Sequence, residues 1–179
     1  KYMFPKAHAA AYVTMSFRIA YFKVHHPQAF YATYFTTKST DFDADLILKG
    51  EAAVRQKLKE LEQKGMGATT KEKNQITVLE VVLEMYTRGF TFDRVDLYRS
   101  DSDRFLINEK GILPPLKALD GVGENAARKI AEEREIKVFM SIEDLVKRGK
   151  ATRPVIDALK GHGCLDSLPE SNQISLFNI

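Results

Sequence analysis

Three features are scarce or missing in this sequence: cysteine, long uncharged apolar runs and low-complexity tracts. The single cysteine, Cys164, excludes an internal disulfide and favours a reducing interior, so we expect a cytoplasmic protein. The most apolar stretch, residues 9–24, contains Arg18 and Lys23, and no stretch reaches the roughly 18 uncharged apolar residues that indicate a membrane span. No signal-peptide pattern is visible. We therefore expect no membrane partner.

Charges of the two signs are nearly balanced. The chain has 27 Lys and Arg against 24 Asp and Glu, a net charge of +3 with a pI near 8.9. This excess favours a polyanionic partner but is too small to identify nucleic acid. With 179 residues, 44% of them hydrophobic, we expect one domain plus an appendage. Because the first residue is lysine rather than methionine, we also expect a piece of a longer protein.

Helical periodicity dominates the first half of the chain. Residues 9–24 are apolar around most of the helical circumference, which predicts a buried helix. Pro27 ends this helix and opens an aromatic one that continues through Phe35, so an aromatic helical hairpin is expected. A further helix is predicted over residues 45–64.

The next helix begins at a capping box, Thr69 with Glu72, and ends at Gly89. From there the apolar period shortens to two, which predicts short strands near residues 92–97 and 105–107. Short helices resume after residue 115. The fold class is therefore mainly α with a small β element.

The segment LPPLKALDGVGENAARKIAEER, residues 113–134, predicts two helices joined by a glycine turn. Gly121 and Gly123 allow positive φ and close approach of a ligand to the backbone, while Val122 fills the gap between the helices. The amides at the start of the second helix form an anion nest.

The cations that follow this turn indicate which anion it binds. Arg128 and Lys129 lie one turn beyond it, with Asn125 between, and together they indicate a nucleic-acid phosphate that is held without reading the base. This is the helix-hairpin-helix pattern. The alternative is an ordinary helical turn with glycine caps.

A second helix pair with the same rhythm follows. Ser141 caps a helix that ends at Gly149, and Thr152 caps the next. The intervening turn, RGKATR, places Lys150 and Arg153 where the first turn has glycine. Two pairs indicate a duplex, with each turn holding one strand.

Residues 4–35 read FPKAHAAAYVTMSFRIAYFKVHHPQAFYATYF, which resembles the fingers of bacterial C-family replicative DNA polymerases. RGFTFDRVDLYRS, residues 88–100, resembles the element that joins those fingers to the duplex-binding part. Pro5, Ala7 and the C-terminal peptide resemble the corresponding residues of the PolC-type branch of this family. The resemblance implies that the chain corresponds to the C-terminal end of such a polymerase. The resemblance implies fingers over residues 1–110, a tandem helix-hairpin-helix domain over 111–168 and a clamp-binding tail over 169–179.

The last residues, NQISLFNI, resemble the pentapeptide that docks bacterial proteins into the sliding clamp. Leu176 and Phe177 are the predicted apolar anchors, Gln173 orients the peptide, and Ile174 replaces the usual leucine. The alternative is a tail packed on its own domain.

The resemblance also implies a nucleotide-binding corner at the start of the chain. Lys6 counters triphosphate charge, His8 donates a hydrogen bond, Phe4 packs near the base, and Arg18 reaches the same phosphates or pairs with a carboxylate. The alternative for the first two is a helix-start lysine and a structural histidine.

Three alternating aspartates, Asp41, Asp43 and Asp45, resemble metal ligands but precede a predicted helix, where acidic residues favour the N-terminal dipole. The histidines and Cys164 lack ligand spacing, so no metal site is predicted.

The palm aspartates of the family match nothing here, so no catalytic residue is predicted and the piece alone is expected to be inactive. In the intact polymerase the resemblance implies primer extension with Mg²⁺, the ligands lying elsewhere, and with primer-template duplex, incoming dNTP and the sliding clamp as partners near the nucleoid. The alternatives are a clamp-recruited, non-catalytic DNA-binding adaptor and a metal-dependent enzyme that uses the three aspartates.

Overall fold

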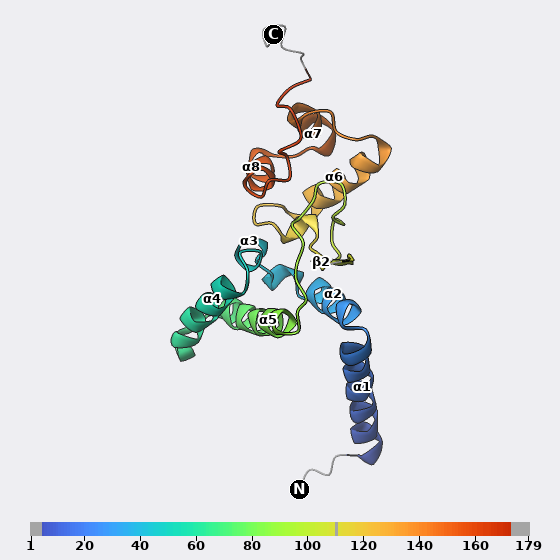
Figure 1. Cartoon of the computed structure of the whole chain (residues 1–179), viewed down its shortest axis with the longest axis vertical. Coiled ribbons are helices and arrows are strands. Elements are labelled where there is room, and N and C mark those ends of the chain that lie inside the picture. The colour runs from blue at the N-terminus through green and yellow to red at the C-terminus, as the bar shows by residue number, and fades with distance from the viewer. Residues whose placement is uncertain (1–4, 110, 173–179) are drawn as a thin grey trace.

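The computed structural model describes residues 5–109 and 111–172. Its α-helices are α1 (Lys6–His25), α2 (Pro27–Thr37), α3 (Ala44–Ile47), α4 (Glu51–Gln63), α5 (Thr70–Thr87), α6 (Glu124–Ile136), α7 (Ile142–Gly149) and α8 (Arg153–Gly161). α1 projects from one end, α4 packs against α5, and α6 to α8 gather at the other end (Figure 1). The predicted fold class is confirmed. Within the described ranges no helix is long and apolar enough to cross a membrane.

The helix predicted over residues 45–64 is divided into α3 and α4. Gly50 has a φ of 95°, a left-handed conformation that turns the chain between them. The predicted capping box at the start of α5 is confirmed, because the Thr69 hydroxyl accepts from the Glu72 amide at 3.3 Å and the Thr69 amide donates to the Glu72 carboxylate at 2.9 Å. The left-handed glycine therefore ends α3 and starts a new helix, although the apolar residues of this segment continue at helical spacing.

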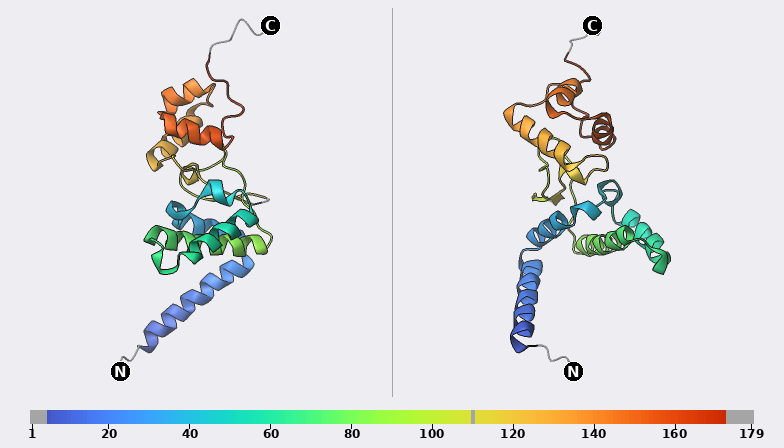
Figure 2. Two further views of the ribbon diagram at one scale, coloured as in Figure 1. Left: turned by 90° about the vertical axis from the view of Figure 1, so that its left-hand side faces the viewer. Right: turned by 180° about the vertical axis from the view of Figure 1, so that it is seen from behind.

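The prediction that the first helix is buried is wrong. α1 extends away from the other helices (Figure 2). Among the described residues it contacts mainly α2, and no residue of α1 is buried. Its large apolar side chains are 52–73% exposed: Tyr12, Val13, Met15, Phe17, Ile19, Tyr21, Phe22 and Val24. The predicted break at Pro27 directs α1 away from the core, so its apolar surface has no counterpart in this part of the chain.

Only the base of α1 is fixed to the core, through a polar network. Lys23 forms an ion pair with Glu84 of α5 at 3.2 Å. Arg88 donates to the Lys23 carbonyl at 3.0 Å and to the Tyr31 hydroxyl at 3.1 Å, and Tyr31 in turn donates to Glu84 at 2.5 Å. Burial, followed by the Glu84 hydrogen bond, raises the pKa of Tyr31 to about 12. The network therefore ties α1, α2 and α5 together at one corner.

An aromatic cluster forms the centre of the core. Phe35 of α2, Phe42, Phe92 and Phe105 have ring centroids 4.8–6.3 Å apart. Tilted and edge-on pairs at these separations stabilise a core beyond the area that they bury. The predicted aromatic face of the second helix is confirmed, since Tyr31 and Phe35 are both 0% exposed.

The sheet is smaller than predicted. Strand β1 (Leu106–Ile107) pairs antiparallel with β2 (Ile112–Leu113), and Phe92 makes a single bridge to Ile112. The strand predicted over residues 92–97 is otherwise wrong. The carboxylate of Asp96 accepts from the amides of Tyr98 and Arg99 at 2.8 Å, which closes a turn there.

Phe35→Ala is expected to lower the free energy of unfolding by about 3–5 kcal/mol, because it leaves a cavity among the aromatic rings. Phe17→Ala on exposed α1 is expected to change it by less than about 0.5 kcal/mol. Urea denaturation followed by circular dichroism measures both. Equal losses would show that Phe17 is covered in solution and would contradict this position of α1.

Candidate nucleic-acid interface

The glycine turn has the geometry that its sequence predicts. A 3-10 turn, η3 (Leu116–Ala118), replaces the short helix expected before it. Gly121 has a φ of 87°, and Val122, 4% exposed, is the predicted apolar plug. Gly123 begins α6 without a side-chain cap, and a Cβ built there meets nothing within 4 Å. The first amides of α6 are therefore open to a ligand.

Gly121 also faces another helix. A Cβ built at Gly121 would lie 3.5 Å from the Pro154 carbonyl oxygen and 3.7 Å from the Ala158 Cβ. The glycine turn therefore lies beside the first half of α8, so the two hairpin turns are neighbours.

The turn between α7 and α8 repeats the backbone of the glycine turn. Lys150 is left-handed with a φ of 50°, Ala151 is 4% exposed, and Thr152 is extended with a φ of −78° and a ψ of 164°. Gly123 has nearly the same angles, −70° and 158°. The predicted second helix pair is present, and its turn shares with the first a positive φ, then a buried apolar residue, then an extended residue before the helix.

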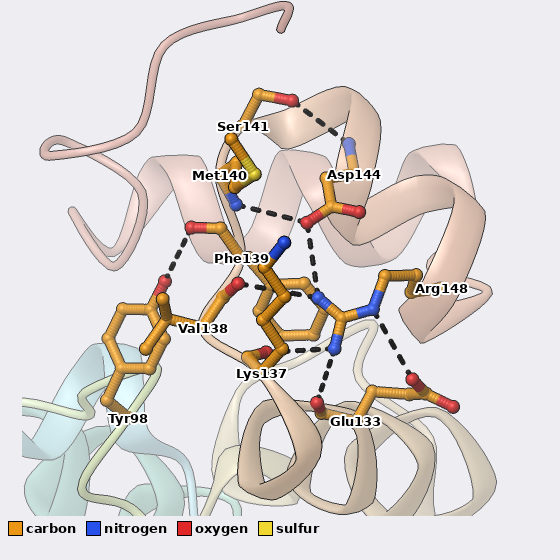
Figure 3. Close-up of polar contacts among 9 residues, drawn as sticks. All are labelled: Tyr98, Glu133, Lys137, Val138, Phe139, Met140, Ser141, Asp144 and Arg148. Carbon is orange, nitrogen blue, oxygen red and sulfur yellow. Dashed lines mark hydrogen bonds and ion pairs between the residues drawn. The ribbon is translucent and has the colours of Figure 1, made fainter.

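Arg148 holds α6, α7 and their connection together (Figure 3). Its guanidinium donates to the carbonyl oxygens of Glu133, Lys137 and Val138 at 2.6, 2.8 and 3.4 Å. It also lies 4.9 Å from the centre of the Phe139 ring. Carbonyls at the end of a helix need such donors when side chains cover them. Sequence reasoning treated this arginine only as part of a basic turn.

Carboxylates complete the Arg148 site. Asp144 lies 3.2 Å and Glu133 3.5 Å from the guanidinium. The Met140 amide, then Arg148, hold the pKa of Asp144 below its usual value. This contribution to stability is complete above the unfolded pKa and lost as pH falls through the folded one. The i, i+4 spacing of Asp144 and Arg148 is the sequence signal for the pair.

The predicted DNA-binding cations differ in their environment. Arg128 forms an ion pair with Glu124 at 2.6 Å, and Lys129 with Glu133 at 2.8 Å, both within α6. Lys150 and Asn125 are exposed. The Arg153 side chain is 93% exposed.

The predicted nucleotide-binding residues do not converge within α1. Lys6, His8 and Arg18 are exposed, and residues two apart face different sides of a helix. Arg18 lies about 18 Å along the axis from Lys6. His8 lies against Tyr12, with ring centroids 4.4 Å apart. Phe4 and the predicted clamp-binding residues lie outside the described residues: Gln173, Ile174, Leu176 and Phe177.

Two of the three alternating aspartates have structural contacts. Asp43 caps α3 by accepting from the Leu46 amide at 3.0 Å, as its position before a helix predicts. Asp45 lies 3.3 Å from Nδ1 of His162, whose Nε2 accepts from the Val95 amide at 3.3 Å. The described residues contain no group of three or more His, Cys, Asp or Glu that could hold a metal ion.

Residues 89–174 match the family described as helix-hairpin-helix motif. The chain is 60% identical to DNA polymerase III PolC-type of Caldanaerobacter subterraneus subsp. tengcongensis, 56% to that of Halalkalibacterium halodurans and 52% to that of Bacillus subtilis, each over 177 residues. These alignments cover 99% of this chain but only 12–13% of each relative.

Gly121→Ala is expected to lower the free energy of unfolding by about 1 kcal/mol or more, because φ is left-handed there. Gly123→Ala, where φ is ordinary and the space is open, is expected to cost less than about 0.5 kcal/mol. Urea denaturation compares the two. A larger loss at position 123 would contradict the open face of the glycine turn.

Proposed function

Because this chain belongs to the family of PolC-type DNA polymerase III, of which it spans a small part, we propose that it grips duplex DNA for a replicative DNA polymerase. The observation that carries the proposal is the pair of neighbouring turns that share a positive φ at their first residue and an extended residue before the following helix. Backbone amides and cations hold phosphates without reading base edges, so the grip is independent of sequence. The unit that binds is the tandem helix-hairpin-helix part, residues 111–168.

Residues 1–110 form the C-terminal part of the fingers in this proposal. The eight exposed apolar side chains of α1 support it, because a helix apolar on all sides is stable only when it is covered. Another part of the polymerase covers them. In this proposal the start of α1, with Phe4, Lys6 and His8, borders the pocket for the incoming nucleotide together with residues from that other part, and Arg18 reaches the same phosphates or pairs with a carboxylate.

The chemistry belongs to the whole polymerase. It would extend a primer with deoxynucleotides, and bound Mg²⁺ would supply the charge that favours attack by the hydroxyl and departure of pyrophosphate. We assign the metal ligands to other segments, because the palm aspartates of the polymerase family match nothing in this sequence. This chain alone does not polymerise. It positions DNA and nucleotide.

The tail tethers the polymerase to the sliding clamp. Pro169 and Glu170 accept from the amides of Ile142 and Glu143 at 2.9 and 3.1 Å, so the chain leaves the core at the start of α7. The proposed tether therefore starts at the end of the α7–α8 pair that is opposite its turn, where Lys160 of α8 forms an ion pair with Glu170 at 2.7 Å. Tethering makes rebinding intramolecular, so modest affinity supports processive synthesis.

The duplex grip is tested by fluorescence anisotropy with two short duplexes of unrelated sequence. The chain is expected to bind both equally, and affinity should fall steeply between about 50 and 200 mM salt because counterions are released from the phosphates. Affinity that ignores salt, or that differs strongly between the sequences, would contradict the proposal.

The tether is tested by calorimetric titration with a bacterial sliding clamp. The chain is expected to bind, and the Gln173→Ala/Phe177→Ala variant is expected to lose binding, because both the apolar anchor and the orienting amide are gone. A Glu170→Ala variant serves as the control. Equal binding by the double variant would show that QISLF is not the tether.

A further inference from the structure

The two hairpin turns share a backbone but differ in charge. The glycine turn is flanked by Asp120 and Glu124. Its two nearest cations on α6 are already engaged, Arg128 with Glu124 at 2.6 Å and Lys129 with Glu133 at 2.8 Å. The hydrogen bond to Glu133 raises the pKa of Lys129. Little positive charge is therefore left for a phosphate at this turn.

The space in front of the glycine turn is also acidic. A cavity of about 640 Å³ opens there, with Gly121, Val122 and Gly123 on one wall. The charged residues that line this cavity are Asp41, Asp43, Asp45, Asp120, Lys71 and Lys117. Lys117 is ion-paired with Asp103. Carboxylates therefore outnumber cations in this cavity, and a phosphate that enters it meets repulsion.

The second turn has the opposite character. Lys150 is exposed and has no ion pair within residues 5–109 and 111–172. Arg153 is 93% exposed at its side chain, and its only carboxylate neighbour in that part of the chain, Asp157, is 3.9 Å away. The exposed Thr152 side chain makes no capping hydrogen bond to α8. Two cations and a hydroxyl are thus available at one turn.

We propose that the second turn, residues 150–153, is the principal phosphate-binding turn, and that the glycine turn serves mainly to seat α8. This rests on the proposed duplex grip. The ligand is the phosphodiester backbone. Gly121 lies against Pro154 and Ala158, where even a Cβ would be at ordinary van der Waals distance, so the glycine turn packs on α8. That contact sets where Arg153, at the start of α8, meets the duplex.

The proposal is tested with two matched double variants, Lys150→Gln/Arg153→Gln and Arg128→Gln/Lys129→Gln. Each removes two positive charges. Duplex affinity is measured by fluorescence anisotropy between about 50 and 200 mM salt. The second-turn variant is expected to lower the slope of log affinity against log salt by about two, so that its affinity falls roughly tenfold less over this range. The glycine-turn variant is expected to lower it by less than one.

Each outcome decides one question. An unmodified chain that binds duplex without salt dependence overturns the duplex grip itself. An unmodified chain that binds as expected, with a slope that falls as much or more in the glycine-turn variant, overturns only the inequality of the turns. Thermal unfolding checks that both variants are folded. If either double variant unfolds, the single variants Lys150→Gln and Arg128→Gln carry the same comparison.

Discussion

The packing of four aromatic rings holds the first half of this chain to the second. Phe35 and Phe42 come from the helical half, whereas Phe92 and Phe105 come from the segment that leads to the hairpins. Side chains far apart in the sequence thus meet in one cluster, and the small sheet is fixed beside it through the bridge of Phe92 to Ile112. The α4–α5 pair and the hairpin unit both take their positions from this contact, which buries apolar area that neither half could cover alone.

The hairpin unit has its own internal constraint. Its turns can lie side by side only if α6 and α7 keep a fixed angle, and Arg148 supplies the hydrogen bonds that a short connection cannot make for itself. Tyr98 adds a bond from its hydroxyl to the Phe139 carbonyl at 3.2 Å (Figure 3). A half-buried cation, Arg148, thus serves stability beside one turn, while the exposed cations Lys150 and Arg153 remain available to a ligand. Position in the sequence does not separate these roles, but burial does.

Local signals were sufficient to predict much of this structure. The capping box, the proline break and the glycine turn each fix a backbone conformation through nearby atoms, and each is where the sequence places it. The exposure of α1 could not be predicted, because an apolar surface indicates that a helix is covered without saying which segment covers it. The sequence also did not predict which cations near the two turns are already ion-paired. Arg128 and Lys129 look available in the sequence, and only the side-chain positions show that Glu124 and Glu133 occupy them.

The polar network of Lys23, Tyr31, Glu84 and Arg88 fixes the direction of α1 at its C-terminal end. A helix of 20 residues is about 30 Å long, so a tilt of about 10° at its base displaces the far end by about 5 Å. Such a displacement is larger than the length of a hydrogen bond. The position of Lys6 therefore depends on the Arg88 guanidinium at the opposite end of the helix. A substitution at Arg88 would displace Lys6 by changing the tilt of α1, without any contact between the two residues.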